Sequence, residues 1–461
     1  MNDVLRQSAC ELRKLLSSKE ISAVELLRVH LEHIEQVNPT VNAIVTECFE
    51  QALENAASLD ESGDLGKPLA GLPIAHKDLV STKGILTTQG SPLYKDHIPA
   101  HNDYIIDRMQ AAGAITIGKT NVPEFGAGSH TFNRVFGPSH NPYDLGRTCG
   151  GSSGGAAVSL ATRMTALADG SDLGGSLRNP AAFCNVIGFR PTNNVLPPTL
   201  EGDHALNLAS LGPMARWVAD VELLFHVLAP NAPTLAEKHA NLNSMDSLRI
   251  AFSENFGHLP VVPEIKQAVR DFATLLAANG ATVVEATPDL SKSREIFHTV
   301  RGLSFRRRYD ALSPAEKVEL KPTILWNIAK GQSIDDAQMR HVQDMRKQLV
   351  AEVDSFFTAN DYDLLVGPTT QVLPFPIPVE WPREVDGVPM DTYIDWMESC
   401  SLITTTECPA LSLPCGFIDG LPVGMQLIAR RHDDMFLLRA ARLIEAVASS
   451  ADVLPSFLCG D

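Results

Sequence analysis

The fold is decided by one stretch, which opens with Cys149-Gly150-Gly151-Ser152-Ser153-Gly154-Gly155 and closes with Gly170-Ser171-Asp172-Leu173-Gly174-Gly175-Ser176-Leu177-Arg178. Glycines at this density permit positive φ angles and let backbone N–H groups approach a ligand closely. Successive free N–H groups form an anion-binding concavity. A serine in such a concavity has what acyl transfer requires, because donors point to where the oxyanion develops.

The residues between the two serine clusters argue against a flexible linker. Residues 156–168 are mostly small and apolar, which favours a buried helix over a solvated tether. Asp172 stands just before Leu173 and could anchor the turn through its backbone N–H groups. We therefore interpret the stretch from Arg147 to Arg178 as an active site.

A serine at its ordinary pKa is a poor nucleophile and needs a base. Neither Ser153 nor Ser176 lies in the G-x-S-x-G elbow of the α/β-hydrolases. No histidine stands in a pattern that ties it to either serine. The sequence therefore directs the search for the base to lysine.

Lys77 is the candidate base, because it lies within the apolar segment 74–80, which is predicted to form a buried strand. Desolvation would lower its pKa and allow it to accept a proton near neutral pH. The competing structural interpretation is an ion pair with a carboxylate such as the adjacent Asp78. Strand alternation places His76 on the opposite face from Lys77, so the two cannot easily serve one site.

The segment Gly113-Ala114-Ile115-Thr116-Ile117-Gly118-Lys119-Thr120 matches the P-loop pattern G-x-x-x-x-G-K-[ST]. That pattern binds phosphate only when it runs from a strand through a glycine-rich loop to a helix N-terminus. Here a predicted helix, 102–112, comes first, and the variable positions are β-branched and favour a strand. Nucleotide binding is therefore a disfavoured alternative, which an ATP-binding assay tests.

The rest of the chain alternates helices with short apolar strands, which is typical of the α/β class. The first forty residues are helical, and Ser22 to Glu25 form a capping box. Further helices are predicted over 43–59, 213–228, 263–279 and 435–447. Strands are predicted over 114–117, 248–252, 282–285, 364–366, 411–413 and 424–428. Residues 293–359 are predicted to form a mostly helical exterior layer. No internal repeat or linker separates these elements, so we expect one domain over 1–461, with its N-terminal helices in 1–60.

The overall composition excludes several functional classes. The 55 acidic and 38 basic residues give a net charge of −17, which disfavours generic nucleic-acid binding. No apolar run approaches the ~20 residues of a membrane span, and the N-terminus lacks a signal-peptide core, so we expect a cytoplasmic protein. The eight scattered cysteines form no C-x-x-C pair, which favours free thiols over disulfides or zinc. We expect no metal and no cofactor.

Taken together, these motifs resemble the amidase signature family. The matching pieces are Lys77-Asp78 after Gly71-Leu72-Pro73, the segments Gly118-Lys119-Thr120-Asn121 and Glu124-Phe125, the two glycine-serine clusters, and Pro180-Ala181-Ala182. They cover about residues 70–195. Asn185, Arg190 and Asn193-Asn194 depart from the common pattern, although none of them belongs to the expected catalytic residues.

The resemblance implies an α/β fold with a central mixed β-sheet between helical layers. It also implies a Ser-cis-Ser-Lys triad, with Ser176 as the acylated nucleophile and Ser152, in a cis peptide, passing a proton to Lys77. The implied oxyanion hole consists of the N–H groups of Leu173, Gly174, Gly175 and Ser176. Supporting roles are implied for Ser153, Asp172 and Arg178. Family analogy further suggests that the substrate pocket includes Gly126, Ala127, Gly128 and Ser129.

The leading functional hypothesis is a free-standing amidase that hydrolyses a small amide, or a related aryl amide, carbamate or urea. The alternative is the amidotransferase subunit of a complex that acts on glutamyl- or aspartyl-tRNA, which shares the triad but needs partner chains. For the free-standing enzyme we expect a small-molecule amide as the substrate. We expect neither nucleic acid nor a membrane as a partner. The sequence does not decide between a monomer and a homodimer.

Overall fold

The computed structural model describes residues 2–197, 207–232, 242–448 and 453–459. Its largest sheet is mixed and has the strand order β12-β11-β13-β17-β16-β9-β10-β8. Only the pairs that β11 makes with β12 and β13 are parallel. The strands are β8 (Leu167–Asp172), β9 (Ile187–Arg190), β10 (Ser210–Ala215), β11 (Arg249–Phe252), β12 (Thr282–Glu285), β13 (Leu364–Pro368), β16 (Ala410–Ile418) and β17 (Leu421–Ala429).

A second, three-stranded sheet carries the predicted base. Its order is β1 (Ile44–Glu47), β3 (Ile115–Thr120) and β2 (Pro73–Lys77), with β2 parallel to β3. Strand β2 also lies close to β8 of the large sheet. The carboxyl ends of these two strands therefore bring the lysine near the glycine-serine stretch. The two-stranded ribbons are β4 (Phe132–Asn133) with β5 (Gly137–Pro138), β6 (His140–Asn141) with β7 (Asp144–Thr148), and β14 (Glu384–Val385) with β15 (Val388–Pro389).

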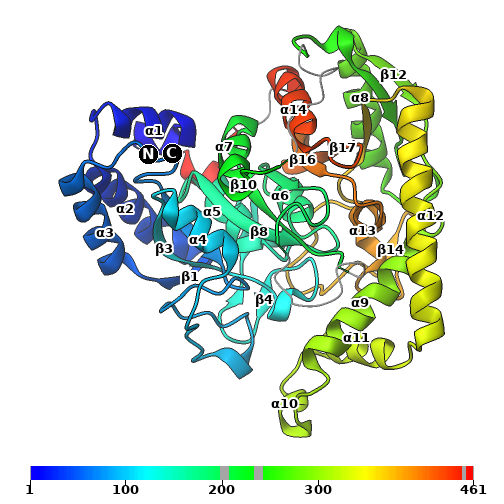
Figure 1. Ribbon diagram of the computed structural model, residues 1–461, viewed down its shortest axis with the longest axis horizontal. Helices are drawn as coiled ribbons and strands as arrows, with labels where there is room; N and C mark the ends of the chain where they lie inside the picture. Colours follow the sequence, from blue (N-terminus) through cyan, green and yellow to red (C-terminus); the bar gives the residue numbers. More distant parts are fainter. Residues whose placement is uncertain (1, 198–206, 233–241, 449–452, 460–461) are drawn as a thin grey trace.

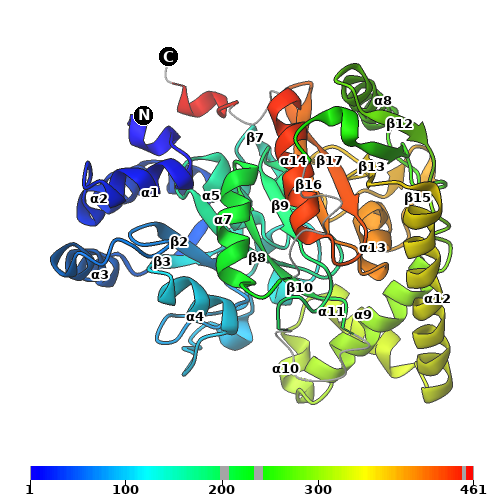
Figure 2. The same cartoon turned by 45° about the horizontal axis from the view of Figure 1, so that its top comes forward.

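Helices flank the large sheet, which confirms the predicted α/β architecture. Helices α7 and α14 lie side by side over it, and α5 and α6 pack together against it (Figures 1 and 2). Helix α8 packs against β12, which is an edge strand, and against β13, which is the third strand from that edge. These helices, with α13, are α5 (Gly154–Ala161), α6 (Arg178–Phe183), α7 (Val218–Leu228), α8 (Pro263–Ala278), α13 (Glu398–Thr405) and α14 (Asp434–Ala448).

The remaining helices stand at the two ends of the molecule. Helices α1, α2 and α3 gather at one end, and the long α12 runs along the other (Figure 1). Helices α9 and α11 pack against each other beside α12 and α13. The bounds are α1 (Ala9–Ser17), α2 (Ala23–Val41), α3 (Phe49–Ser62), α4 (Tyr104–Ala111), α9 (Ser293–Tyr309), α10 (Pro314–Val318), α11 (Pro322–Gln332) and α12 (Asp336–Asn360).

Local signals located several of these elements correctly. The capping box predicted at Ser22 is present, with its hydroxyl accepting from the Glu25 N–H. Helix α8 begins at Pro263, where a missing N–H costs nothing. Within the described residues, no helix combines the length and apolar character that crossing a bilayer demands.

Three predicted helices are wrong in part. Residues 44–47 form strand β1 before α3 begins, because the β-branched run Ile44-Val45-Thr46 pairs with β3. Helix α7 begins only after strand β10 ends at Ala215. The buried helix expected over 156–168 stops at Ala161, and the chain then enters β8.

Candidate active site

Lys77 is the last residue of β2, and its side chain is completely buried. Its ammonium nitrogen Nζ lies 2.8 Å from Ser152 Oγ and 2.8 Å from Ser153 Oγ. Ser171 adds its hydroxyl at 3.0 Å and its carbonyl oxygen at 3.2 Å. Both glycine-serine clusters therefore converge on one lysine that lies 75 residues upstream of Ser152.

The protonation of Lys77 is set by its burial. Desolvation lowers the pKa of Lys77 from 10.5 to about 7, although the carboxylates of Asp172 and Asp169 oppose the shift. Neither carboxylate forms a salt bridge with Lys77 within the described residues. The ion pair with Asp78 is also wrong, because that carboxylate accepts from the N–H and hydroxyl of Thr88. A substantial fraction of Lys77 is therefore the free amine at neutral pH.

Asp169, on β8, fixes the backbone that presents this lysine. Its Oδ2 accepts from the Lys77 N–H at 3.2 Å, and its Oδ1 lies 2.7 Å from His76 Nδ1. The other ring nitrogen of His76 contacts the Thr116 hydroxyl. His76 thus faces away from the serines, as strand alternation predicts, and it ties β2 to β8.

The peptide bond between Gly151 and Ser152 is cis, as the family resemblance implied. Ser153 follows at the N-terminus of α5. Its hydroxyl can reach Lys77 because the facing residue of β8 is Gly170. A Cβ built on Gly170 would lie 2.7 Å from Ser153 Oγ and 2.5 Å from a Leu177 methyl carbon, so only glycine allows this approach.

The loop after β8 is held by a buried ion pair. Arg178 donates from Nε and Nη2 to the two carboxylate oxygens of Asp172, each at 2.9 Å. It also donates from Nη1 to Gln426 on β17 and to the Cys400 carbonyl of α13. Burial raises the pKa of Asp172, but Arg178 and Arg190 outweigh it and hold that pKa well below the usual range. Asp172 is therefore a permanent anion that fixes the loop to the sheet.

One of the four expected oxyanion donors is already engaged. The Gly175 N–H donates to Asp172 Oδ1 at 2.7 Å, so it is not free to bind an oxyanion. The expected donors are then the N–H groups of Leu173, Gly174 and Ser176. A side chain at position 174 would require the neighbouring helix α9 to shift. A Cβ there would lie 2.6 Å from the ring of Phe297 on α9.

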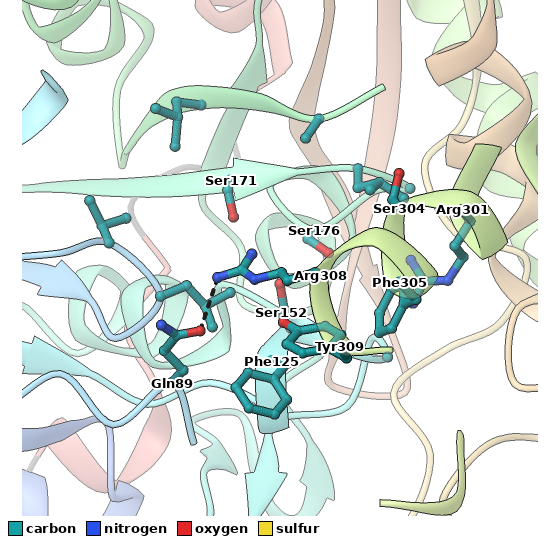
Figure 3. Close-up of a pocket in the computed structure, with 18 of the residues that line it drawn as sticks. Gln89, Phe125, Ser152, Ser171, Ser176, Arg301, Ser304, Phe305, Arg308 and Tyr309 are labelled. Atoms are coloured by element: carbon teal, nitrogen blue, oxygen red, sulfur yellow. Dashed lines mark hydrogen bonds between the residues drawn. The ribbon is translucent and has the colours of Figure 1, made fainter. Parts of the chain in front are cut away.

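Ser176 is half-buried and shares one cavity with Ser152 and Ser171. Figure 3 shows the three hydroxyl groups directed into this cavity, with Phe125, Phe305 and Tyr309 as its aromatic wall. The remaining lining residues are Leu79, Val80, Ser81, Gln89, Asp103, Gly126, Gly128, Leu173, Gly174, Ala209, Leu211, Arg301, Ser304, Arg308 and Met397.

The predicted pocket segment 126–129 divides into two pairs. Gly126 and Gly128 line the cavity. Ala127 instead packs in the apolar cluster that includes the aromatic wall, and it does not line the cavity itself. Ser129 donates to the Gly151 carbonyl at 2.7 Å, beside the cis peptide. The prediction that Ala127 and Ser129 line the substrate pocket is therefore wrong.

The P-loop match is a coincidence of sequence. Lys119 is the penultimate residue of strand β3 and is completely buried. Its ammonium group donates to the Val80 carbonyl and to the Thr82 hydroxyl. It therefore braces the segment after β2 and does not face a phosphate at a helix N-terminus.

Sequence reasoning missed two contributions to the site. Ser171 is a direct neighbour of Lys77 Nζ, and the quoted motif Gly170-Ser171-Asp172 could have indicated it. Helix α9, predicted as part of an exterior layer, supplies Arg301 and Arg308 to the cavity. No local signal marks these arginines, because only the tertiary packing of α9 brings them to the serines.

Comparisons with known proteins agree with this fold. A family model described as Amidase matches residues 25–438. An acylamidase of Rhodococcus erythropolis is 33% identical, over 97% of this chain and 97% of that protein. One subunit of the glutamyl-tRNA(Gln) amidotransferase of Dehalococcoides mccartyi is 30% identical, over 97% of this chain and 98% of that one. The solved structure of a bacterial aryl acylamidase of the amidase signature enzymes superimposes with a TM-score of 0.89 at 27% identity, covering 99% of both chains.

The fold and these relatives define an enzyme that hydrolyses carbon–nitrogen bonds. The chain belongs to the amidase signature family.

Proposed function

We propose that this chain is a free-standing amidase that hydrolyses a small-molecule amide through an acyl-enzyme on Ser176. The observation that carries the proposal is the buried Lys77, which lies 2.8 Å from the hydroxyl of Ser152 in a cavity that also exposes Ser176. The similarity to an acylamidase and an aryl acylamidase supports an aryl amide as a substrate.

In the acylation step, neutral Lys77 accepts the proton of Ser152, and Ser152 accepts the proton of Ser176 as that oxygen attacks the carbonyl carbon. The carbonyl becomes an oxyanion, which the N–H groups of Leu173, Gly174 and Ser176 would stabilise. Each such donor is typically worth about 3 kcal/mol of transition-state stabilisation. When the C–N bond breaks, the proton returns through Ser152 to the leaving nitrogen.

Deacylation repeats the sequence with water in place of the serine hydroxyl. Water gives its proton through Ser152 to Lys77 and attacks the ester carbonyl. Collapse of the second oxyanion breaks the bond to Ser176 Oγ, which recovers its proton. The products are a carboxylic acid and an amine, and the enzyme returns to its starting state.

The purified chain is expected to hydrolyse simple aryl amides, such as an acyl p-nitroanilide, without any added protein. Release of p-nitroaniline measures the reaction, and the same assay compares an ester, a urea and a carbamate. A chain that is inactive on every member of this panel would contradict the proposed free-standing amidase.

The second candidate function is the amidotransferase component of a tRNA-dependent complex. Its support is the 30% identity to one subunit of such an enzyme over nearly the whole length of both chains. This function predicts no activity on the panel until partner chains and charged tRNA are added. The same panel, assayed with and without those components, separates the two candidates.

We expect the enzyme to lose activity as the pH falls, with an apparent pKa close to 7. Protonated Lys77 cannot accept the proton of Ser152, and burial lowers its pKa to about 7. The value of kcat/KM should therefore rise with pH through about 7 and then level off. A pH–rate profile between 5 and 9 measures this. Activity that is constant down to pH 5 would remove Lys77 from the role of base.

A further inference from the structure

Helix α9 presents one face to the active-site cavity. Arg301, Ser304, Phe305 and Arg308 lie at positions i, i+3, i+4 and i+7 of a helix, and all four line the cavity. Figure 3 shows Arg301, Ser304 and Phe305 to one side of Ser152 and Ser176, while the Arg308 side chain extends past the serines toward Gln89. The face carries two guanidinium groups and no carboxylate.

Arg301 is the unusual member of this set, because only 4% of its surface is exposed. Its Nε and Nη2 both donate to the Tyr393 hydroxyl oxygen, at 3.1 and 2.6 Å. That oxygen also accepts from Asn327 Nδ2 at 2.5 Å. Tyr393 thus holds the guanidinium by one edge and leaves the Nη1 edge directed elsewhere.

The Nη1 group of Arg301 makes no hydrogen bond within the described residues, yet it is not sealed off from solvent. None of the salt bridges among the described residues includes Arg301. The ring of Phe305 lies 4.8 Å from its Cζ atom, but a cation–π contact compensates only part of the cost of desolvating a guanidinium. Arg301 therefore lines the cavity as a cation that pairs with no anion among the described residues.

The rest of the lining does not supply that anion. Asp103 is the one carboxylate among the described lining residues, and its Oδ2 accepts from the Ser81 N–H at 2.7 Å. The exposed Arg308 donates to Gln89 Oε1 at 3.0 Å, so it adds a second cation to the lining. The positive charge of the cavity thus exceeds its negative charge, although the chain as a whole is strongly acidic.

We propose that Arg301 binds a carboxylate carried by the substrate, so that the preferred substrates are amides whose acyl or amine part bears an anionic group. This inference rests on the proposed amidase function. The planar guanidinium matches a carboxylate geometrically, and the nearly dry surroundings strengthen their attraction. Tyr393 and Asn327 orient Arg301 and do not themselves touch the substrate.

The test compares two p-nitroanilides of nearly equal size, one with a succinyl group and one with a succinamoyl group, in which a neutral amide replaces the carboxylate. The wild-type enzyme is expected to give a kcat/KM at least tenfold higher for the succinyl substrate. In Arg301→Met this ratio should fall to one or below. Arg307→Met removes an exposed arginine of the same helix that does not line the cavity, and it should keep the wild-type ratio. An unchanged ratio in Arg301→Met, or a wild-type preference for the neutral amide, would overturn the proposal.

A binding measurement separates this inference from the proposed chemistry. Calorimetric titration of the Ser176→Ala protein with succinate and with succinamide needs no turnover. Succinate is expected to bind at least tenfold more tightly, and Arg301→Met in the same background should abolish the difference. Equal binding of the two ligands would overturn the carboxylate site even if the enzyme hydrolyses amides. Selective succinate binding by a protein inactive on every amide would support the site and refute the proposed function.

Discussion

Replacing Ser176 with alanine is expected to lower kcat on an aryl amide by about five orders of magnitude or more, since removing a nucleophile costs on the order of 10⁶ in a comparable catalytic set. The variant retains the ion pair between Asp172 and Arg178, which joins the two ends of the loop that contains position 176. We therefore expect the conformation of that loop to be unchanged. Because the alanine side chain offers no oxygen to attack, no acyl-enzyme can form. Initial-rate kinetics with a p-nitroanilide measures the loss.

The matched control for this variant is Ser159→Ala. Ser159 lies on α5 between the two serine clusters, and its hydroxyl donates to the Ala156 carbonyl, away from the cavity. Its kcat should stay within a few-fold of the wild type. Comparable losses in Ser159→Ala and Ser176→Ala would point to a damaged fold and contradict the nucleophile assignment.

Replacing Lys77 with methionine is expected to lower kcat by about 10³-fold to 10⁴-fold, at the upper end of what a general base contributes. Methionine keeps most of the side-chain volume but cannot accept a proton from Ser152. We expect the far-ultraviolet circular dichroism to be unchanged, because strand β2 remains buried between its neighbours. Steady-state kinetics at pH 8, where wild-type Lys77 is mostly neutral, measures the effect.

A second buried lysine provides the control for Lys77. Lys119 is equally buried, but its ammonium group contacts Val80 and Thr82 rather than the serines. Lys119→Met should lower the melting temperature and leave the kcat of the folded fraction within about tenfold. Kinetics of Lys77→Met that match the wild type would eliminate this lysine from the mechanism.

The catalytic geometry was accessible from the sequence because its chemistry is local. The glycines around Ser152 and Ser176 predict backbone that a Cβ would block, and Gly170 and Gly174 meet that description. A lysine in an apolar strand predicts a desolvated amine, which Lys77 is. The family resemblance then joined the two segments, since no periodicity relates positions 77 and 152.

What could not be predicted depends on long-range packing. The residues of strand β1 are predicted as part of a helix because their partner, β3, lies about seventy residues away. In the sequence, Arg301 is one of several charged residues in a polar predicted helix. It lines the cavity only because α9 packs against the site. The engagement of the Gly175 N–H by Asp172 depends on a loop conformation that composition does not encode.

The position of a covalent adduct shows whether Ser176 is the nucleophile. The purified enzyme is treated with a fluorophosphonate, digested, and analysed by tandem mass spectrometry. We expect a single modified serine, Ser176, and no modification of the Ser176→Ala variant. An adduct on Ser152, Ser153 or Ser171 in the wild type, or persistent labelling of the variant, would contradict this assignment.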